Sequence, residues 1–387
     1  MYADDVILIS ETASGLQNCL NQHSKYCERW NLEINTPKSK AMVFNNRGRL
    51  KTDVLKFNSS IIENVRSYTY LGITFSVSGA FTEAKPQHLY KKGLKAYFKL
   101  IQSFDGHKPN IKTLIHIFDH TVKPVLMYGS EIWGYFHGFR LSSKDNVCFI
   151  KLFNSFPLEN IHKKFCKYVL EVNKRTTNIG VMGELGRYPL MLEVLLNILS
   201  YYVRLLNSDE ILLKEAFFVS EQLVNENKGS WTSCVKAISR FLGLSPVKFK
   251  RKLIRHKVIK LLQEKYILKW QELLFRDNSN SDHGNKLRTY RLFKSNFCFE
   301  KYLEWGDYRK RKNITRFRLS AHDLEIEKGR YTGVKAHQRF CKLCSSEVED
   351  EIHFLLKCSA LDTTRSSFIE NIKVIIKILN LYLIRIN

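Results

Sequence analysis

The chain opens with Met1-Tyr2-Ala3-Asp4-Asp5-Val6-Ile7-Leu8-Ile9, in which two adjacent carboxylates stand directly before a run of aliphatic residues. The aliphatic run predicts a buried strand. An Asp pair before a strand is most often an ordinary polar turn. The same pair at the tip of a tight hairpin can instead project both acids into a cleft and bind divalent cations, as phosphoryl transfer requires. The Asp pair alone therefore does not distinguish a polar turn from a cation-binding hairpin, and the downstream sequence is needed.

Further elements are predicted downstream of the aliphatic run. Ser14-Gly15-Leu16-Gln17 has the form of a capping box, which predicts the start of a helix. The apolar side chains of this helix recur at helical spacing: Leu16, Cys19, Leu20, His23, Tyr26, Cys27 and Trp30. Strands are predicted at 41–44 and 69–75. From Pro86 the pattern becomes helical, with one helix from about Asn110 to Pro124 and mostly helix as far as Phe275.

Several segments in order resemble one family of polymerases. Tyr2-Ala3-Asp4-Asp5 and the aliphatic run resemble the catalytic hairpin of reverse transcriptases. Later segments resemble non-LTR (LINE-type) retrotransposon polymerases: Tyr26-Cys27-x-x-Trp30, Leu32-x-x-Asn35-x-x-Lys38-Ser39-Lys40, Met42-Val43-Phe44 and, as the primer-grip hairpin, Tyr70-Leu71-Gly72-Ile73. Two longer motifs, at 118–134 and 184–190, resemble signatures of the region that follows the palm in such elements.

The resemblance implies a role for each matching residue. Asp4 would be a Mg²⁺ ligand of the polymerase site and Asp5 its neighbour with a secondary role, while Tyr2 would line the nucleotide and template end. Either Lys38 or Lys40 would lie near the incoming triphosphate; ordinary solvent exposure is the alternative for both lysines. Tyr70, Leu71 and Gly72 would contact the primer. The reaction implied is RNA-templated DNA synthesis from a primer 3′-hydroxyl.

One departure from the family pattern limits this expectation. The family takes another metal-binding carboxylate from a strand well before the Asp-Asp hairpin, with the fingers before that strand, and only Met1 precedes Tyr2 here. We therefore expect the C-terminal part of a reverse transcriptase that is not competent alone but binds RNA template and DNA primer or target, and potentially the element RNA. A zinc-containing nucleic-acid-binding protein without catalysis, or the product of a decayed element, are the alternatives.

A metal-binding pattern lies near the end of the chain. Cys341-x₂-Cys344-x₈-His353-x₄-Cys358 offers three thiols and one imidazole at a spacing that suits a tetrahedral Zn²⁺ site. With four protein ligands there is no open position for water, so the predicted role of zinc is structural. A chance grouping of thiols is the alternative. The motif also resembles the C-terminal cysteine-histidine motif of LINE-type elements.

The positive charge of the chain is concentrated in a few segments. The 62 Lys and Arg residues outnumber the 37 Asp and Glu residues and give a net charge of +25, which indicates a polyanionic partner. Two clusters are candidates for nucleic-acid contacts: Lys248, Lys250, Arg251, Lys252, Arg255 and Lys257 in one, and Arg309, Lys310, Arg311, Lys312, Arg316 and Arg318 in the other. A third candidate is the lysine face at 91–99. A solvated helix face or an acidic lipid surface is the alternative for the first cluster.

These features predict an α+β protein. It comprises a partial polymerase palm (a β-hairpin plus a helix), then a mainly helical thumb and C-terminal region with a small zinc motif. The predicted segments are a palm remnant with the primer-grip-like hairpin at 1–81, a thumb-like region at 82–138, a helical extension at 139–276, a linker and basic segment at 277–340, and the zinc motif with a terminal helix at 341–387. The chain shows no secretion signal and no uninterrupted membrane span, so we expect a nuclear or cytoplasmic protein without a membrane partner.

Overall fold

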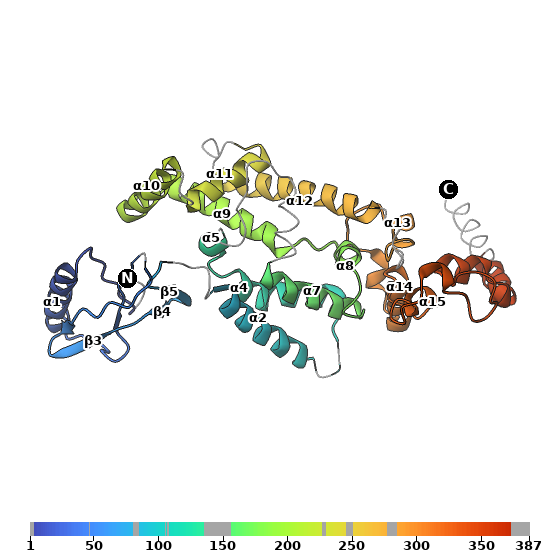
Figure 1. The fold of residues 1–387 in the computed structure, drawn as a ribbon, viewed down its shortest axis with the longest axis horizontal. Coiled ribbons are helices and arrows are strands. Elements are labelled where there is room, and N and C mark those ends of the chain that lie inside the picture. Colours follow the sequence, from blue (N-terminus) through green and yellow to red (C-terminus); the bar gives the residue numbers. More distant parts are fainter. Residues whose placement is uncertain are drawn as a thin grey trace, which may run out of the picture.

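The computed structural model describes residues 4–45, 47–79, 85–104, 106, 108–134, 156–226, 230–244, 251–276 and 285–372. The described residues form a mixed but mostly helical, elongated molecule (Figure 1). A small α/β module lies at one end, a body of helices fills the middle, and the Cys/His motif lies at the other end. The predicted combination of helix and a small amount of strand is confirmed.

The N-terminal module packs one helix on a small sheet. Helix α1 (Ala13–Arg29) lies against β2, and the sheet has the order β1-β3-β2, with β1 parallel and β2 antiparallel to β3. The bounds of these strands are Lys40–Ala41 (β1), Leu55–Phe57 (β2) and Ser60–Asn64 (β3). The core between helix and sheet is small: Leu20, Cys27, Ala41, Leu55, Phe57 and Ile62. A separate hairpin follows, with β4 at Ser67–Tyr70 and β5 at Ile73–Ser76.

The predicted strand after the Asp pair is wrong. Residues 6–9 form no strand, and Ile7 and Ile9 are 48% and 82% exposed. Leu8 packs against the small core, but within the described part of the chain no neighbouring strand pairs with this run. Because a strand needs a hydrogen-bonding partner, aliphatic composition alone did not suffice.

The predicted capping box is also wrong. Helix α1 is capped by Thr12, whose Oγ1 accepts a hydrogen bond from the Gly15 amide at 3.0 Å. Gln17 does not serve the helix end. Its side-chain amide reaches β2 instead, where Nε2 donates to the Lys56 carbonyl at 2.7 Å and Oε1 accepts from the Lys56 amide at 2.8 Å. The glutamine therefore joins the helix to the sheet.

Two other expectations on secondary structure are confirmed in outline. The helix predicted from Pro86 is α2 (Lys85–Gln102), and the one predicted from Asn110 is α3 (Ile111–Thr121), which Asn110 caps. Pro124 does not end that helix, because it lies in the first turn of the short α4 (Lys123–Met127). The strand expected at 69–75 is a hairpin with its turn at Leu71 and Gly72.

Helix α9 is the centre of the helical body. Ten of the 17 residues of α9 (Leu190–Leu206) are buried, and the helix packs against α5, α7, α10, α11 and α12, whose bounds follow. The bounds of the other helices around it are Ser130–Trp133 (α5), Pro157–Leu170 (α7), Asn178–Leu185 (α8), Ile211–Asn225 (α10), Trp231–Leu242 (α11) and Arg251–Phe275 (α12). In the part of the chain that the structure describes, no single helix is long and apolar enough to span a membrane; α8 and α9 reach that composition only as a pair bent by 68°.

Short helices build the C-terminal part. In order they are α13 (Tyr290–Phe293), η3 (Lys301–Glu304), α14 (Tyr308–Arg318), α15 (Glu325–Lys328), η4 (Ala336–Gln338), η5 (His353–Lys357) and η6 (Ser359–Leu361). The basic cluster predicted at 309–318 is therefore a helix, α14, which begins after the capping residue Asp307. The predicted linker at 277–285, apart from Asn285, and the end of the chain at 373–387 lie outside the described residues.

Candidate functional site

Asp4 lies in a turn and Asp5 in an isolated β-bridge. Both side chains are exposed, and they precede the aliphatic run described above. No third acid, histidine or cysteine among the described residues lies close enough to complete a metal-binding group with them. A two-metal polymerase site needs at least one further carboxylate. The described residues therefore do not by themselves fit a pair of Mg²⁺ ions, and Tyr2 lies outside them.

The two candidate lysines are in different situations. Lys40 lies in β1, and its Nζ pairs with Glu63 Oε2 at 2.6 Å. Lys38 is exposed and lies in a turn. Its backbone carbonyl accepts a hydrogen bond from the Tyr68 hydroxyl at 3.1 Å. In the described part of the chain no carboxylate pairs with Lys38. Of the two, Lys38 is the lysine with an available ammonium group, and its role at a triphosphate stays a prediction.

The primer-grip-like hairpin has a tight two-residue turn. Tyr70 and Ile73 pair across it, while Leu71 and Gly72 both have positive φ, +46° and +75°. This combination is typical of a type I′ turn. The Tyr128 hydroxyl donates a hydrogen bond to the Leu71 carbonyl at 2.6 Å, so the hairpin tip contacts the helical body.

Lysines line the outer face of α2. Lys91, Lys92, Lys95 and Lys99 are all exposed, and α2 has no acidic residue. Among the described residues no carboxylate pairs with any of them. Phe98 is 45% exposed on the same helix, and Lys164 of the neighbouring α7 lies over its ring at 4.4 Å from the centroid. This lysine face is an open cationic surface among the described residues.

The first predicted basic cluster is only partly described. Lys248 and Lys250 lie outside the described residues, and Arg251 and Lys252 belong to the first turn of α12. Arg255 and Lys257 are exposed, as is Lys260 one turn later. Val258 and Leu262 are fully buried, so α12 has the amphipathic character that the sequence predicts.

The second basic cluster, on α14, is largely used inside the protein. Arg318 donates to the buried Glu184, with Nε to Oε1 at 2.5 Å, and Lys312 pairs with Glu171 at 3.6 Å. Arg316 donates to the Glu171 carbonyl and Arg311 to the Trp305 carbonyl. Arg309 and Lys310 are exposed, and Lys310 pairs with Asp307 at 3.6 Å. Sequence reasoning missed Glu184 and Glu171 because they lie more than 130 residues earlier in the chain.

Four consecutive residues of the second family motif, Glu184 to Arg187, contact parts of the protein that lie far away in the sequence. Glu184 accepts hydrogen bonds from the Tyr290 and Tyr302 hydroxyls at 2.9 and 2.6 Å, in addition to Arg318. Leu185 forms a β-bridge with Phe299. A Cβ on Gly186, whose φ is +58°, would lie 2.6 Å from the Phe299 nitrogen. The motif therefore has a structural role. The fourth of these residues, Arg187, contacts α3.

Arg187 links the two family motifs. Its guanidinium donates to both carboxylate oxygens of Asp119 at 2.6 and 2.7 Å, and its Nε lies 3.3 Å from His162 Nε2. Burial would raise the pKa of Asp119, but the hydrogen bonds and charge of Arg187 outweigh this effect and leave that pKa below its ordinary value. Glu159 and His162 are fully buried and hydrogen bonded at 2.9 Å. Cys166 is buried beside them, so this thiol and imidazole have no access to a substrate.

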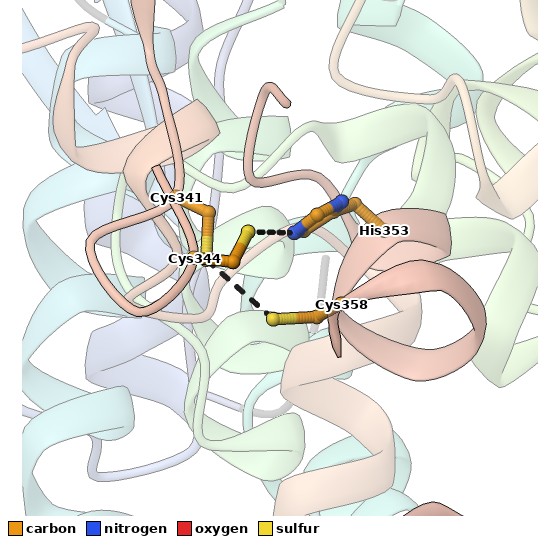
Figure 2. Close-up of side chains that lie close together, drawn as sticks. All are labelled: Cys341, Cys344, His353 and Cys358. Carbon is orange, nitrogen blue, oxygen red and sulfur yellow. Dashed lines mark hydrogen bonds between the residues drawn. The ribbon is translucent and has the colours of Figure 1, made fainter. Parts of the chain in front are cut away.

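The four predicted zinc ligands lie together (Figure 2). Their ligand atoms all lie within 4.8 Å of one another; Cys341 Sγ is 3.9 Å from Cys358 Sγ, and Cys344 Sγ is 3.3 Å from His353 Nε2. Figure 2 shows the four side chains pointing toward one another from the knuckle at 341–344 and from η5 and its end. Zn–S bonds of about 2.3 Å and Zn–N bonds of about 2.0–2.1 Å require separations of this size. The donor set and its geometry fit one zinc ion.

The surroundings of the cluster favour a thiolate at Cys344 and an oriented imidazole, while burial raises the pKa of Cys341. Hydrogen bonds from Ser346 lower the pKa of Cys344 to about 6. His353 Nδ1 lies 3.3 Å from Glu347 Oε2, which leaves Nε2 to face the thiols. A carboxylate partner of this kind fixes the orientation of a metal-binding histidine. Glu347 is a residue of the site that the ligand spacing alone did not reveal.

Glu351 attaches the cysteine–histidine element, residues 340–358, to the rest of the protein. Its fully buried carboxylate accepts hydrogen bonds from Arg288 at 2.7 and 2.9 Å and from Thr289 at 2.8 Å, and His322 Nε2 lies 2.7 Å from it. Burial would raise its pKa, but His322 and Arg288 lower it to about 2. His322 lies in this contact and not in the cluster of Cys341, Cys344, His353 and Cys358.

Comparison with known proteins identifies the relationship. Residues 1–75 match the family described as reverse transcriptase (RNA-dependent DNA polymerase). The chain is 25% identical over 168 residues to the RNA-directed DNA polymerase from mobile element jockey of Drosophila melanogaster, a match covering 41% of this chain and 17% of that protein. Jockey is a LINE-type, non-LTR element. The chain is related to the reverse transcriptases of non-LTR retrotransposons.

Two more relatives agree with this reverse transcriptase relationship. The jockey polymerase of Drosophila funebris is 25% identical over 141 residues, which is 34% of this chain and 15% of that protein. A transposon-derived protein of Caenorhabditis elegans is 28% identical over 138 residues, 34% of this chain and 47% of its own length. The chain thus spans less than half the length of each of these relatives. No solved structure matches it. The match at residues 1–75 places Asp4, Asp5, Lys38, Lys40 and the hairpin in the part related to reverse transcriptases.

Proposed function

We propose that this chain is the primer- and template-binding part of an RNA-directed DNA polymerase of a non-LTR retrotransposon. The observation that supports it best is the exposed lysine face of α2, which stands beside a module related to reverse transcriptases. Lysines without acidic partners attract phosphates, and an exposed aromatic ring such as Phe98 can stack on an unpaired base. The partners are therefore an RNA template and a DNA primer or target.

Catalysis is expected to need more than the described residues. Asp4 would contribute one metal-binding carboxylate and Asp5 an auxiliary one, but a Mg²⁺ pair requires a further acid. We therefore expect the 387-residue chain alone to bind primer and template without extending the primer. A primer-extension assay with Mg²⁺, an RNA template and all four deoxynucleoside triphosphates tests this. Extension that Asp4→Asn abolishes would overturn the expectation.

Nucleic-acid binding through α2 is tested with a charge-matched pair of variants. In the first, Lys91, Lys92, Lys95 and Lys99 are changed to Gln; in the control, the change is made at Lys214, Lys236, Lys269 and Lys328, which each pair with an acid. The first variant should bind a primer–template more weakly and with a smaller dependence on salt concentration, because fewer counterions are released. Equal losses in both variants, or binding that does not depend on salt, would contradict the proposal.

A non-catalytic, zinc-containing nucleic-acid-binding protein is the second candidate. The Cys341, Cys344, His353 and Cys358 cluster favours it, because it fits a zinc ion independently of Asp4 and Asp5. These four residues would hold the ion, which would stabilise the C-terminal fold and leave no position for a reacting water. Two results together would favour this candidate. Nucleic-acid binding would be unchanged by Asp4→Asn, and primer extension would stay absent even when a second polypeptide that supplies the missing carboxylate is added.

A further inference from the structure

The hairpin of β4 and β5 has only limited support from its own module. It is a two-stranded sheet separate from the three-stranded one, and most of its side chains are partly or fully exposed. Isolated two-stranded hairpins are marginally stable in water. Its base is attached by backbone hydrogen bonds from Val77 to Arg66 and from Asn45 to Val77. The position of its tip therefore depends on contacts elsewhere.

Tyr128 supplies such a contact at the tip. Its hydroxyl donates to the Leu71 carbonyl at 2.6 Å, between residues 57 positions apart in the sequence. The ring lies beneath the turn, because a Cβ on Gly72 would be 3.3 Å from Tyr128 Cε1. The contact thus depends on a glycine at this position and on a left-handed Leu71, a conformation that non-glycine residues rarely adopt.

Tyr128 is itself held firmly by the helical body. Its carbonyl accepts a hydrogen bond from Trp133 Nε1 at 2.6 Å, and Trp133 is only 1% exposed. Gly129, with φ +68°, turns the chain from α4 into α5 directly after it. The Glu131 carbonyl in α5 accepts from Trp231 Nε1 at 2.8 Å, which connects the same corner to α11. The tyrosine is therefore a rigid contact point on the helical body.

We propose that Tyr128 is a positioning residue that fixes the hairpin turn relative to the helical body and so sets where a primer 3′-end can lie. This inference rests on the proposed function, because it takes the hairpin as the primer contact. The Tyr128 side chain is half exposed, so its hydroxyl is not required to fill a core. Its loss should change the orientation of the hairpin without unfolding the protein.

The test compares Tyr128→Phe with Tyr331→Phe. Tyr331 is also half exposed, and its hydroxyl makes no hydrogen bond among the described residues. Affinity is measured for a primer–template with a recessed 3′-end and for a blunt duplex of the same sequence, and hydrogen–deuterium exchange is measured on peptides covering residues 67–76. Tyr128→Phe should weaken binding of the recessed end by about three- to tenfold, the effect of one hydrogen bond, and leave the blunt duplex unchanged. Exchange in the hairpin should rise while the melting temperature stays the same.

The other outcomes distinguish failure of the proposed primer-binding function from failure of the role of Tyr128. If the unmodified chain binds neither duplex, or does not prefer the recessed end, the primer-binding function is overturned and the inference with it. If the unmodified chain prefers the recessed end and Tyr128→Phe keeps that preference, only the role of Tyr128 is overturned. Equal weakening of both duplexes would also overturn it, since a general structural defect would explain that result.

Discussion

The guanidinium of Arg187 donates two hydrogen bonds to the Asp119 carboxylate, at 2.6 and 2.7 Å. Each residue belongs to a different family motif, one on α3 and the other directly after α8. The motifs therefore meet in space and stabilise the packing of the helical body.

Asp119→Asn should lower the free energy of unfolding by about 2–4 kcal/mol, because the partly buried Arg187 would lose its charged partner. Lys214→Gln, which removes an exposed pair with Asp209, should change it by less than about 1 kcal/mol. Both values are measured by urea denaturation followed by circular dichroism. Similar losses in the two variants would show that the pair contributes no more than a surface contact.

The same pair predicts how stability depends on pH. Because the folded protein lowers the pKa of Asp119, its contribution is fully present above the pKa of the unfolded chain, about 3.9, and is lost as the pH falls through the lower, folded value. Below about pH 4 the unmodified protein should therefore lose stability more steeply than Asp119→Asn does. Thermal unfolding at a series of acidic pH values measures both slopes. Parallel curves would rule out a contribution from this carboxylate.

Removal of the metal should loosen the C-terminal element. We expect one equivalent of zinc by elemental analysis of the purified chain. Chelation should increase hydrogen–deuterium exchange over residues 340–358 and leave α9 protected, because zinc binding and local folding are coupled. Cys341→Ser should have the same effect without chelator. Cys298→Ser, at an exposed cysteine outside the cluster, serves as the control and should retain the zinc. Full zinc content in Cys341→Ser would contradict the assignment.

Glu351→Gln should also detach the cysteine–histidine element, but by breaking its contact with Arg288 and not by loss of zinc. The fully buried carboxylate would lose its charge opposite Arg288, at a cost of about 3–5 kcal/mol for breaking a buried pair. Exchange should increase at residues 285–289 and 320–322 as well as in the element, while zinc stays bound. Loss of zinc without any change at residues 285–289 would show that Glu351 acts on the metal site and not on docking.

Local patterns predicted the elements well where neighbours in sequence decide the outcome. The helices at 85–102 and 111–121 and the grouping of Cys341, Cys344, His353 and Cys358 follow from spacing, while the hairpin at 67–76 was expected from the family resemblance. The zinc itself stays a prediction. Distant partners could not be predicted: β2 and β3 were missed, and the strand at 6–9 does not form because a ladder needs a second strand. Arg318 and Lys312 were expected on a nucleic-acid surface, but they face Glu184 and Glu171, more than 130 residues earlier.

The contacts of residues 184–187 also determine where this protein can be divided. Glu184 lies on α8, yet its partners Tyr290, Tyr302 and Arg318 all lie beyond α12. If the two parts on either side of a division between α8 and α13 were expressed separately, a carboxylate and two phenols would lack their partners, so neither part should stay soluble as a folded fragment. Limited proteolysis of the intact protein should therefore leave residues 156–361 associated even where the backbone is nicked.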